Sequence, residues 1–189
     1  MSSHPNSVDL ASVDLTTETV RTERLVLRPY RPEDADAVYR ACLDPDIQRW
    51  LTLPAPYTSA DAEEFVGVIT VSARAEKRAL LTAVEADGEF VGSAGVHFSA
   101  SLLGPGVGYW LAPWARGRGY AAEAARALAD WALRHGAPRV HLLADVGNIA
   151  SQAVARRAGF AEEGVVRSCL PYRDGARGDA VLFGRLPGD

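Results

Sequence analysis

The segment Trp114–Ala121, which reads WARGRGYA, combines the residue types of an anion-binding loop. Gly117 and Gly119 allow the backbone to approach a ligand closely and to adopt positive φ. Arg116 and Arg118 supply guanidinium groups, each of which can bind phosphate through several N–H donors. A helical apolar pattern follows directly, and the start of a helix offers unpaired N–H groups and the positive end of its dipole. The segment therefore predicts a site for a phosphorylated ligand.

Two common nucleotide-binding motifs do not account for this segment. The GxGxxG fingerprint follows the first strand of a βαβ unit, whereas Gly104, Gly106 and Gly108 have a different spacing and precede a strand. A Walker P-loop needs a Gly-Lys-Ser/Thr ending, and Lys77 is the only lysine in the chain. A tight turn with two exposed arginines stays open as the alternative.

Length, charge and cysteine content restrict the class of protein. The 189 residues are 48% hydrophobic, which is enough for one domain with a sizeable core. The net charge of -4 opposes a broad nucleic-acid-binding face. Two cysteines favour a reducing compartment over a disulfide framework. The chain shows neither a secretory signal pattern nor an apolar run long enough to span a bilayer, so we expect a cytoplasmic protein without a membrane partner.

The elements that must position the loop follow from apolar periodicity and turn residues. We expect residues 1–20 to form a loosely held tail and residues 21–187 to form a single domain. The expected helix at 58–73 buries Ala62, Phe65, Val66, Ile69 and Ala73, and the helix after Asn148 turns Ala150, Val154 and Ala158 inward. We expect strands at 24–30, 80–86, 89–98, 106–113, 140–144, 160–168 and 178–186, and helices from 32, at 58–73, at 120–135 and from 148. This order predicts a mixed α/β domain with a largely antiparallel sheet and one parallel crossover through residues 120–135.

Several motifs in this order resemble one family, the GNAT (Gcn5-related) N-acetyltransferases, and most closely its RimJ/RimL-like branch. Arg116, Gly119 and Ala121 match the family's pyrophosphate loop, Q/R-x-x-G-x-G/A. The resemblance covers most of the chain, through Thr22-Glu23-Arg24-Leu25-x-Leu27-Arg28, Gly108-Tyr109-Trp110-Leu111, Gly117-x-Gly119-Tyr120-Ala121-x-Glu123-Ala124, Asn148-x-x-Ser151 and Gly159-Phe160.

The resemblance implies a fold, a reaction and a set of ligand contacts. The GNAT-type fold has about seven mostly antiparallel strands, splayed in the middle, and about four helices. Acetyl-CoA would be the co-substrate, and its acetyl group would pass directly to a primary amine of a protein N-terminus or a small molecule. No metal is implied, and a homodimer is compatible with the pattern. The residues that would bind coenzyme A are Trp110, Leu111, Ala112, Arg116, Gly117, Arg118, Gly119, Tyr120, Ala121, Asn148 and Ser151.

Direct transfer requires a group that protonates the departing thiolate and a group that accepts a proton from the amine. Many members of the family carry a tyrosine where this chain has Ala155, so Ser151 is the expected acid. Relatives often carry a glutamate where this chain has Gly106, so the base stays open. His97 has the most suitable intrinsic pKa, but a reaction without a dedicated base is an alternative. The other candidates for the base are Glu85, Tyr109, Asp145 and Glu163.

The resemblance places the amine acceptor at the opposite mouth of the cleft, against Trp50, Tyr109 and Tyr172. Aromatic and acidic groups there would suit a cationic amine. Transfer of a longer acyl group such as succinyl, and a catalytically idle CoA-binding module, are the alternative functions. An RNA-binding module that uses the arginines is a third possibility, which the net charge opposes.

Overall fold

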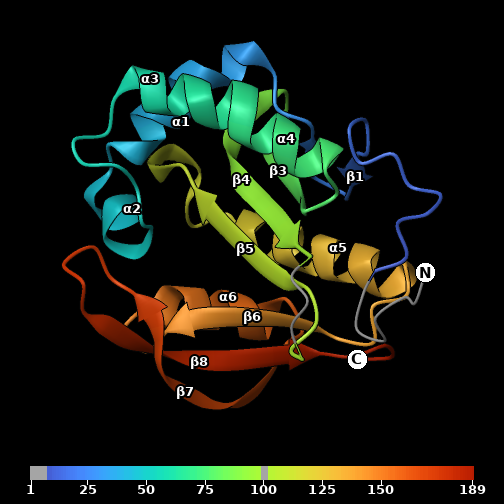
Figure 1. Cartoon of the computed structure of the whole chain (residues 1–189). Helices are drawn as coiled ribbons and strands as arrows, with labels where there is room; N and C mark the ends of the chain where they lie inside the picture. The colour runs from blue at the N-terminus through green and yellow to red at the C-terminus, as the bar shows by residue number, and fades with distance from the viewer. Residues whose placement is uncertain (1–7, 99–101) are drawn as a thin grey trace.

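The computed structural model describes residues 8–98 and 102–189 and shows one sheet flanked by helices on both faces (Figure 1). The sheet has eight strands in the order β1-β2-β3-β4-β5-β6-β8-β7. The strands are β1 (Val20–Arg21), β2 (Val26–Arg28), β3 (Ala79–Ala86), β4 (Glu89–His97), β5 (Gly106–Leu111), β6 (Val140–Asp145), β7 (Ala161–Pro171) and β8 (Arg177–Arg185). The α-helices are α1 (Ala35–Cys42), α2 (Pro45–Trp50), α3 (Ser59–Glu64), α4 (Thr70–Ala75), α5 (Tyr120–Arg134) and α6 (Ile149–Arg157).

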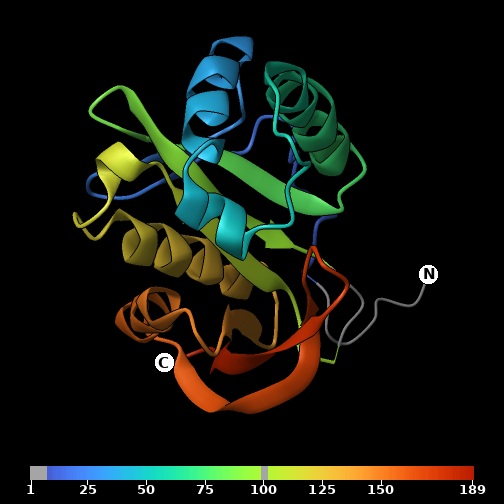
Figure 2. The same cartoon turned by 90° about the vertical axis from the view of Figure 1, so that its left-hand side faces the viewer.

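The sheet is split between β5 and β6, as the family resemblance implies. These two strands are parallel and pair only at Gly106 and His141, whereas β4 and β5 pair antiparallel over the whole length of β5. Beyond that one pair, β5 and β6 diverge toward their carboxyl ends (Figure 1). Figure 2 looks toward this open end, with α2 and the loop between β7 and β8 beside it. The GNAT-type architecture is therefore confirmed, with the two-residue β1 as the extra strand.

Two apolar clusters cover the sheet, one on each face. α5 contributes most to the larger cluster, because its apolar residues recur at helical spacing. The smaller cluster joins α1, α2 and α3 to β4 and β5 through Phe90 and Trp110. Six of the residues that make up the apolar pattern after the loop are all buried, namely Ala121, Ala124, Ala125, Leu128, Trp131 and Ala132. A well-packed helix thus leads directly out of the predicted anion-binding loop.

The described part of the N-terminal segment packs on the domain, so the expectation of a loose tail is wrong for residues 8–20. Val8, Val13 and Leu15 are buried in the larger cluster. The indole of Trp131 donates to the Glu18 carboxylate at 2.9 Å, and this contact fastens the segment to α5. The sequence pattern did not show this, because three scattered apolar residues have no period. Residues 1–7 lie outside the described part.

Two predicted helix faces differ from the structure. A π-helical turn, Phe65–Ile69, lies between α3 and α4 and adds one residue to the repeat. Ile69 is therefore 45% exposed, and Thr70 is buried in its place. In α6, Ala150 is exposed and Val154 is partly buried, while Gln152 and Ala155 face inward with Ala158. Gln152 explains this rotation, since its Nε2 donates to the carbonyl oxygens of Asp145 and Val146.

Candidate functional site

The loop between β5 and α5 presents a row of unpaired backbone donors. Gly117 and Gly119 have φ of +78° and +82°, which only glycine adopts without strain. Among the residues that the structure describes, no oxygen accepts a hydrogen bond from the backbone N–H groups of residues 117–122. The first bond of α5 runs from Glu123 N to Gly119 O. We call residues 116–122 the amide loop, and its donors can surround an anion.

The two arginines of the amide loop do not behave alike. The Arg116 guanidinium donates to Asp44 at 2.6 Å and lies 3.4 Å from Asp46, so it ties the loop to α2. This bond holds the pKa of Asp44 below its ordinary value. Arg118 is exposed and its carbonyl oxygen points toward Arg24, at 2.9 Å from Nη1. Backbone N–H groups therefore form the inner surface of the loop.

A cavity of about 570 Å³ lies against the amide loop, and we call it the loop-side cavity. Its wall combines the loop with the carboxyl end of β5, the start of α6 and the inner side of α2. Eight of the predicted coenzyme A contacts line it: Trp110, Leu111, Arg116, Gly117, Gly119, Ala121, Asn148 and Ser151. Three others do not, namely Ala112, Arg118 and Tyr120.

The open edge of β5 offers further donors to this cavity. Ala112 N donates to Val91 O at 3.0 Å, so this amide points toward β4 and is not available to a ligand in the cavity. Because N–H groups alternate between the two sides of a strand, the N–H groups of Leu111 and Tyr109 face the split. β6 pairs with β5 only at Gly106, which leaves these two amides without a strand partner.

A second cavity, of about 930 Å³, opens toward the loop between β7 and β8, and we call it the hairpin-side cavity. Trp50, Leu51, Tyr109, Gly147, Asn148 and Ser151 line both cavities. The side chain of Trp50 reaches across the opening from α2, since a Cβ on Gly147 would lie 3.6 Å from its indole. The two cavities therefore meet inside the split of the sheet.

Tyr109 and Ser151 face each other where the cavities meet. Their hydroxyl oxygens are 2.9 Å apart, and either can donate. Burial raises the pKa of Tyr109 to about 12, although the hydrogen bond with Ser151 opposes the shift. Asn148 Oδ1 accepts from Ser151 N at 2.9 Å, so Asn148 caps α6 and fixes where Ser151 lies. The raised pKa keeps the Tyr109 hydroxyl protonated at neutral pH.

The structure separates the candidate bases. His97 ends β4, opposite Gly106, and lines neither cavity. Glu85 pairs with Arg28, at 2.7 Å, and Glu163 pairs with Arg139, at 2.7 Å. Only Asp145 and Tyr109 of the predicted set reach the hairpin-side cavity. Ala155, which stands at the position of the family's tyrosine, is fully buried in the core.

Asp145 and Tyr172 form a polar contact in the hairpin-side cavity that the sequence did not reveal. The Tyr172 hydroxyl donates to Asp145 Oδ2, and this bond raises the pKa of Tyr172. Gly147 N donates to the other oxygen, Oδ1, at 2.7 Å. None of the ion pairs among the described residues includes Asp145. Gly178 makes room for the Tyr172 ring, because a Cβ there would overlap it.

Within residues 8–98 and 102–189, no group of three or more His, Cys, Asp or Glu side chains is placed to hold a metal ion. In the same residues, no helix has the length and apolar character that crossing a membrane requires.

Known proteins with similar sequences and structures share this architecture. A family model described as an acetyltransferase (GNAT) domain matches residues 24–161. A Bacillus subtilis (strain 168) protein named "Putative ribosomal N-acetyltransferase YdaF" is 30% identical over 87% of this chain and 92% of its own. Mycobacterium smegmatis RimJ in complex with CoA-disulfide is 26% identical, with a TM-score of 0.79, over 90% of this chain and 88% of that chain.

A third similar protein supports the fold alone. It is RimL, a ribosomal L7/L12 alpha-N-protein acetyltransferase solved in complex with coenzyme A. It is 23% identical, with a TM-score of 0.77, over 89% of this chain and 98% of that chain.

Proposed function

The chain belongs to the GNAT family of acetyltransferases and is an acetyl-CoA-dependent N-acetyltransferase, and we propose that its acceptor is the α-amine at the N-terminus of a protein. The observation that carries this proposal is the meeting of two cavities at Tyr109 and Ser151. One cavity has unpaired backbone donors for a phosphorylated thioester, and the other has the Asp145 carboxylate, which belongs to no ion pair among the described residues, for a cationic amine. The similarity to YdaF, whose name describes it as a ribosomal N-acetyltransferase, agrees with a protein acceptor.

The loop-side cavity fits coenzyme A. The N–H groups of residues 117–122 lack acceptors, and a pyrophosphate would satisfy several of them beside the helix dipole of α5. The open edge of β5 would pair with the pantetheine arm as an added strand does. Acetyl-CoA supplies the acetyl group as a thioester. In this arrangement the N–H group of Leu111 or Tyr109 lies where it can stabilise negative charge on the carbonyl oxygen.

Ser151 and Tyr109 handle the proton that the leaving sulfur needs. The Ser151 hydroxyl would donate its proton to the sulfur and regain one from the Tyr109 hydroxyl, 2.9 Å away. The pKa of Tyr109, raised to about 12 by burial, keeps that proton available throughout the neutral range. Water in the open hairpin-side cavity would take the proton from the amine and return one to Tyr109, which lines the same cavity. His97 has no part in this arrangement because it lines neither cavity.

Asp145 is the group in the hairpin-side cavity that suits an ammonium. Its hydrogen bonds come from neutral donors, and none of the ion pairs among the described residues includes it. Tyr172 holds the carboxylate from the loop between β7 and β8. Trp50 adds an aromatic face from α2. A peptide N-terminus that enters past this loop would place its ammonium against Asp145.

The test compares peptides that differ only in which amine is free. Each peptide contains an internal lysine and is prepared in two forms, one with a free N-terminus and one with a blocked α-amine. Each form is incubated with acetyl-CoA, and thiol release is measured. Mass spectrometry of the products locates the acetyl group. We expect acetylation at the α-amine and little turnover of the blocked form. Transfer only to lysine side chains or to small amines would contradict the proposal.

A further inference from the structure

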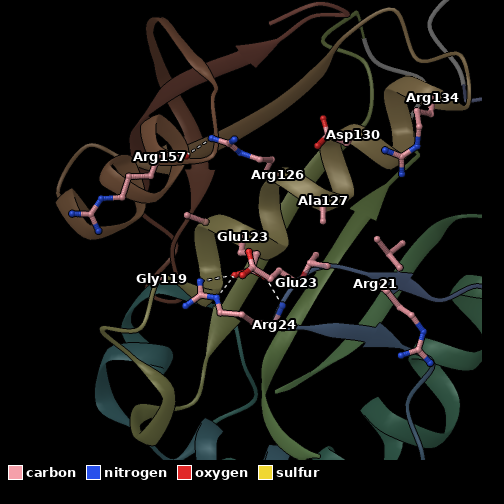
Figure 3. Close-up of a pocket in the computed structure, with 13 residues that line it drawn as sticks. Arg21, Glu23, Arg24, Gly119, Glu123, Arg126, Ala127, Asp130, Arg134 and Arg157 are labelled. Atoms are coloured by element: carbon pink, nitrogen blue, oxygen red, sulfur yellow. Dashed lines mark hydrogen bonds and ion pairs between the residues drawn. The ribbon is translucent and has the colours of Figure 1, made fainter. Parts of the chain in front are cut away.

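The N-terminal Thr22-Glu23-Arg24-Leu25 motif lies behind the amide loop, outside both cavities of the split sheet. A hollow of about 600 Å³ separates it from the outer side of α5, and Gly119 lines both this hollow and the loop-side cavity. Figure 3 shows Arg24 at the bottom of the hollow, between Glu123 and Gly119. We propose that Arg24, held by Glu123, is a positioning residue that aims the amide loop at the pyrophosphate. This inference rests on the proposed function.

One guanidinium contacts three consecutive parts of the loop. Arg24 Nη1 donates to Arg118 O at 2.9 Å. Nη2 lies 3.5 Å from where a Cβ on Gly119 would stand. The guanidinium carbon lies 5.1 Å from the ring centre of Tyr120, the first residue of α5. Arg24 therefore contacts the short segment in which the chain turns from strand to helix.

Glu123 fixes the position of that guanidinium. Its Oε2 accepts from Arg24 Nε at 2.7 Å, and its Oε1 accepts from Arg24 N at 3.1 Å and from the Thr22 hydroxyl at 2.6 Å. Although partial burial opposes ionisation, the hydrogen bonds from Thr22 and Arg24 hold the pKa of Glu123 below its ordinary value. Glu123 is in the first turn of α5. Its bonds therefore hold the Thr22-Glu23-Arg24-Leu25 motif and the start of α5 together as one unit.

The orientation of a single peptide group links this contact to ligand binding. In a trans peptide the C=O and the following N–H point in opposite directions. Arg24 holds the Arg118 carbonyl on the side of the hollow, so the Gly119 N–H must point to the other side, toward the loop-side cavity. Without Arg24 this peptide group can rotate more freely, because Gly119, which supplies its N–H group, tolerates many backbone conformations.

Stability alone does not explain the arrangement. The Arg24 side chain is 48% exposed, and a half-exposed ion pair contributes little to the free energy of unfolding. Arg21, three residues earlier in the chain, also lines the hollow, and its side chain forms no hydrogen bond or ion pair among the described residues. Arg21→Ala is therefore a matched control that changes the net charge by the same amount as Arg24→Ala.

The experiment compares two thioester donors, acetyl-CoA and S-acetyl-pantetheine, which lacks the pyrophosphate. We expect Arg24→Ala to raise KM for acetyl-CoA about tenfold, the equivalent of one lost hydrogen bond to a charged group, with kcat retained. Turnover of S-acetyl-pantetheine should stay within about twofold of that of the unsubstituted protein, because the rest of the site is untouched. Arg21→Ala should change the kinetic constants with neither donor. Glu123→Gln should also raise KM for acetyl-CoA. If Arg24→Ala does not fold, Arg24→Lys is measured in its place.

Two results would overturn the inference while leaving the proposed function intact. One is an equal change in acetyl-CoA KM for Arg24→Ala and Arg21→Ala, which would indicate an effect of charge alone. The other is a parallel loss with both donors, which would indicate a general structural role. If the unsubstituted protein used both donors equally well, the amide loop would not bind pyrophosphate, and the proposed donor site would fail together with the inference.

Discussion

The two cavities that meet at Ser151 are built in different ways. The loop-side cavity presents backbone N–H groups from one continuous segment, the amide loop, backed by one long helix. The hairpin-side cavity is assembled from side chains such as Trp50, Asp145 and Tyr172, which come from α2, β6 and the β7–β8 loop. A site made of backbone N–H groups recognises the pyrophosphate, which all acyl-CoA donors share. A site made of side chains from separate elements can change its acceptor by few substitutions without disturbing the donor.

The largest expected effect concerns the hydroxyl that both cavities share. Ser151→Ala should lower kcat about 100-fold, because a positioned general acid contributes at least this much in other enzymes, with little change in either KM. The backbone N–H of residue 151 still binds Asn148, so α6 keeps its cap. Thiol release at saturating donor and amine measures the effect. Ser59→Ala, on an exposed helix start, is the control, and an unchanged kcat in Ser151→Ala would remove Ser151 as the acid.

The second prediction tests the hairpin-side cavity alone. Asp145→Asn should raise KM for the amine about tenfold, because it removes the charge that pairs with the ammonium. KM for acetyl-CoA should not change, since Asp145 does not line the loop-side cavity. Steady-state kinetics with each substrate varied in turn measures both constants. Asp36→Asn, at an exposed acid of α1, controls for net charge, and a shift confined to acetyl-CoA would contradict the division between the cavities.

The third prediction tests the loop-side cavity with a matched pair of glycines. Gly117 and Gly136 have φ of +78° and +90°, and a Cβ at either would meet no atom within 4 Å. Alanine at either position should cost about 1 kcal/mol of stability through backbone strain. Only Gly117→Ala should also raise KM for acetyl-CoA, about fivefold, because relief of the strain turns loop amides away from the ligand. Equal KM values in the two variants would show that the loop conformation is not what binds the donor.

The difference between a site built from one segment and a site built from separate elements also decides what the sequence could predict. The amide loop is local: two glycines, two arginines and a helical period lie within twenty residues, and Gly117, Gly119 and the buried face of α5 are found as predicted. Contacts between distant residues leave no such pattern. Tyr172 meets Asp145 across 27 residues, and Arg116 meets Asp44 across 72.

Packing also overrode two periodic patterns. The π-helical turn before Thr70 shifts a helix face by one residue, and the bonds of Gln152 rotate α6. Both effects depend on the neighbours of each helix, which a period of 3.6 residues does not describe. The packed N-terminal segment, with Val8 and Leu15 buried, belongs to the same class, because only its contacts with α5 and the sheet order it.

The smallest expected effect concerns Tyr109, at the boundary between the two cavities. Burial raises its pKa to about 12, so the neutral phenol persists up to that pH, where an ordinary tyrosine would lose its proton near 10. The kcat/KM for the amine should rise through about pH 8 as the α-ammonium deprotonates and should then change by less than about twofold up to pH 10. A pH profile with a peptide amine measures this. A fall with a midpoint near pH 10 that disappears in Tyr109→Phe would mean that the phenol is solvated, and the two cavities would then be one continuous, water-filled cleft.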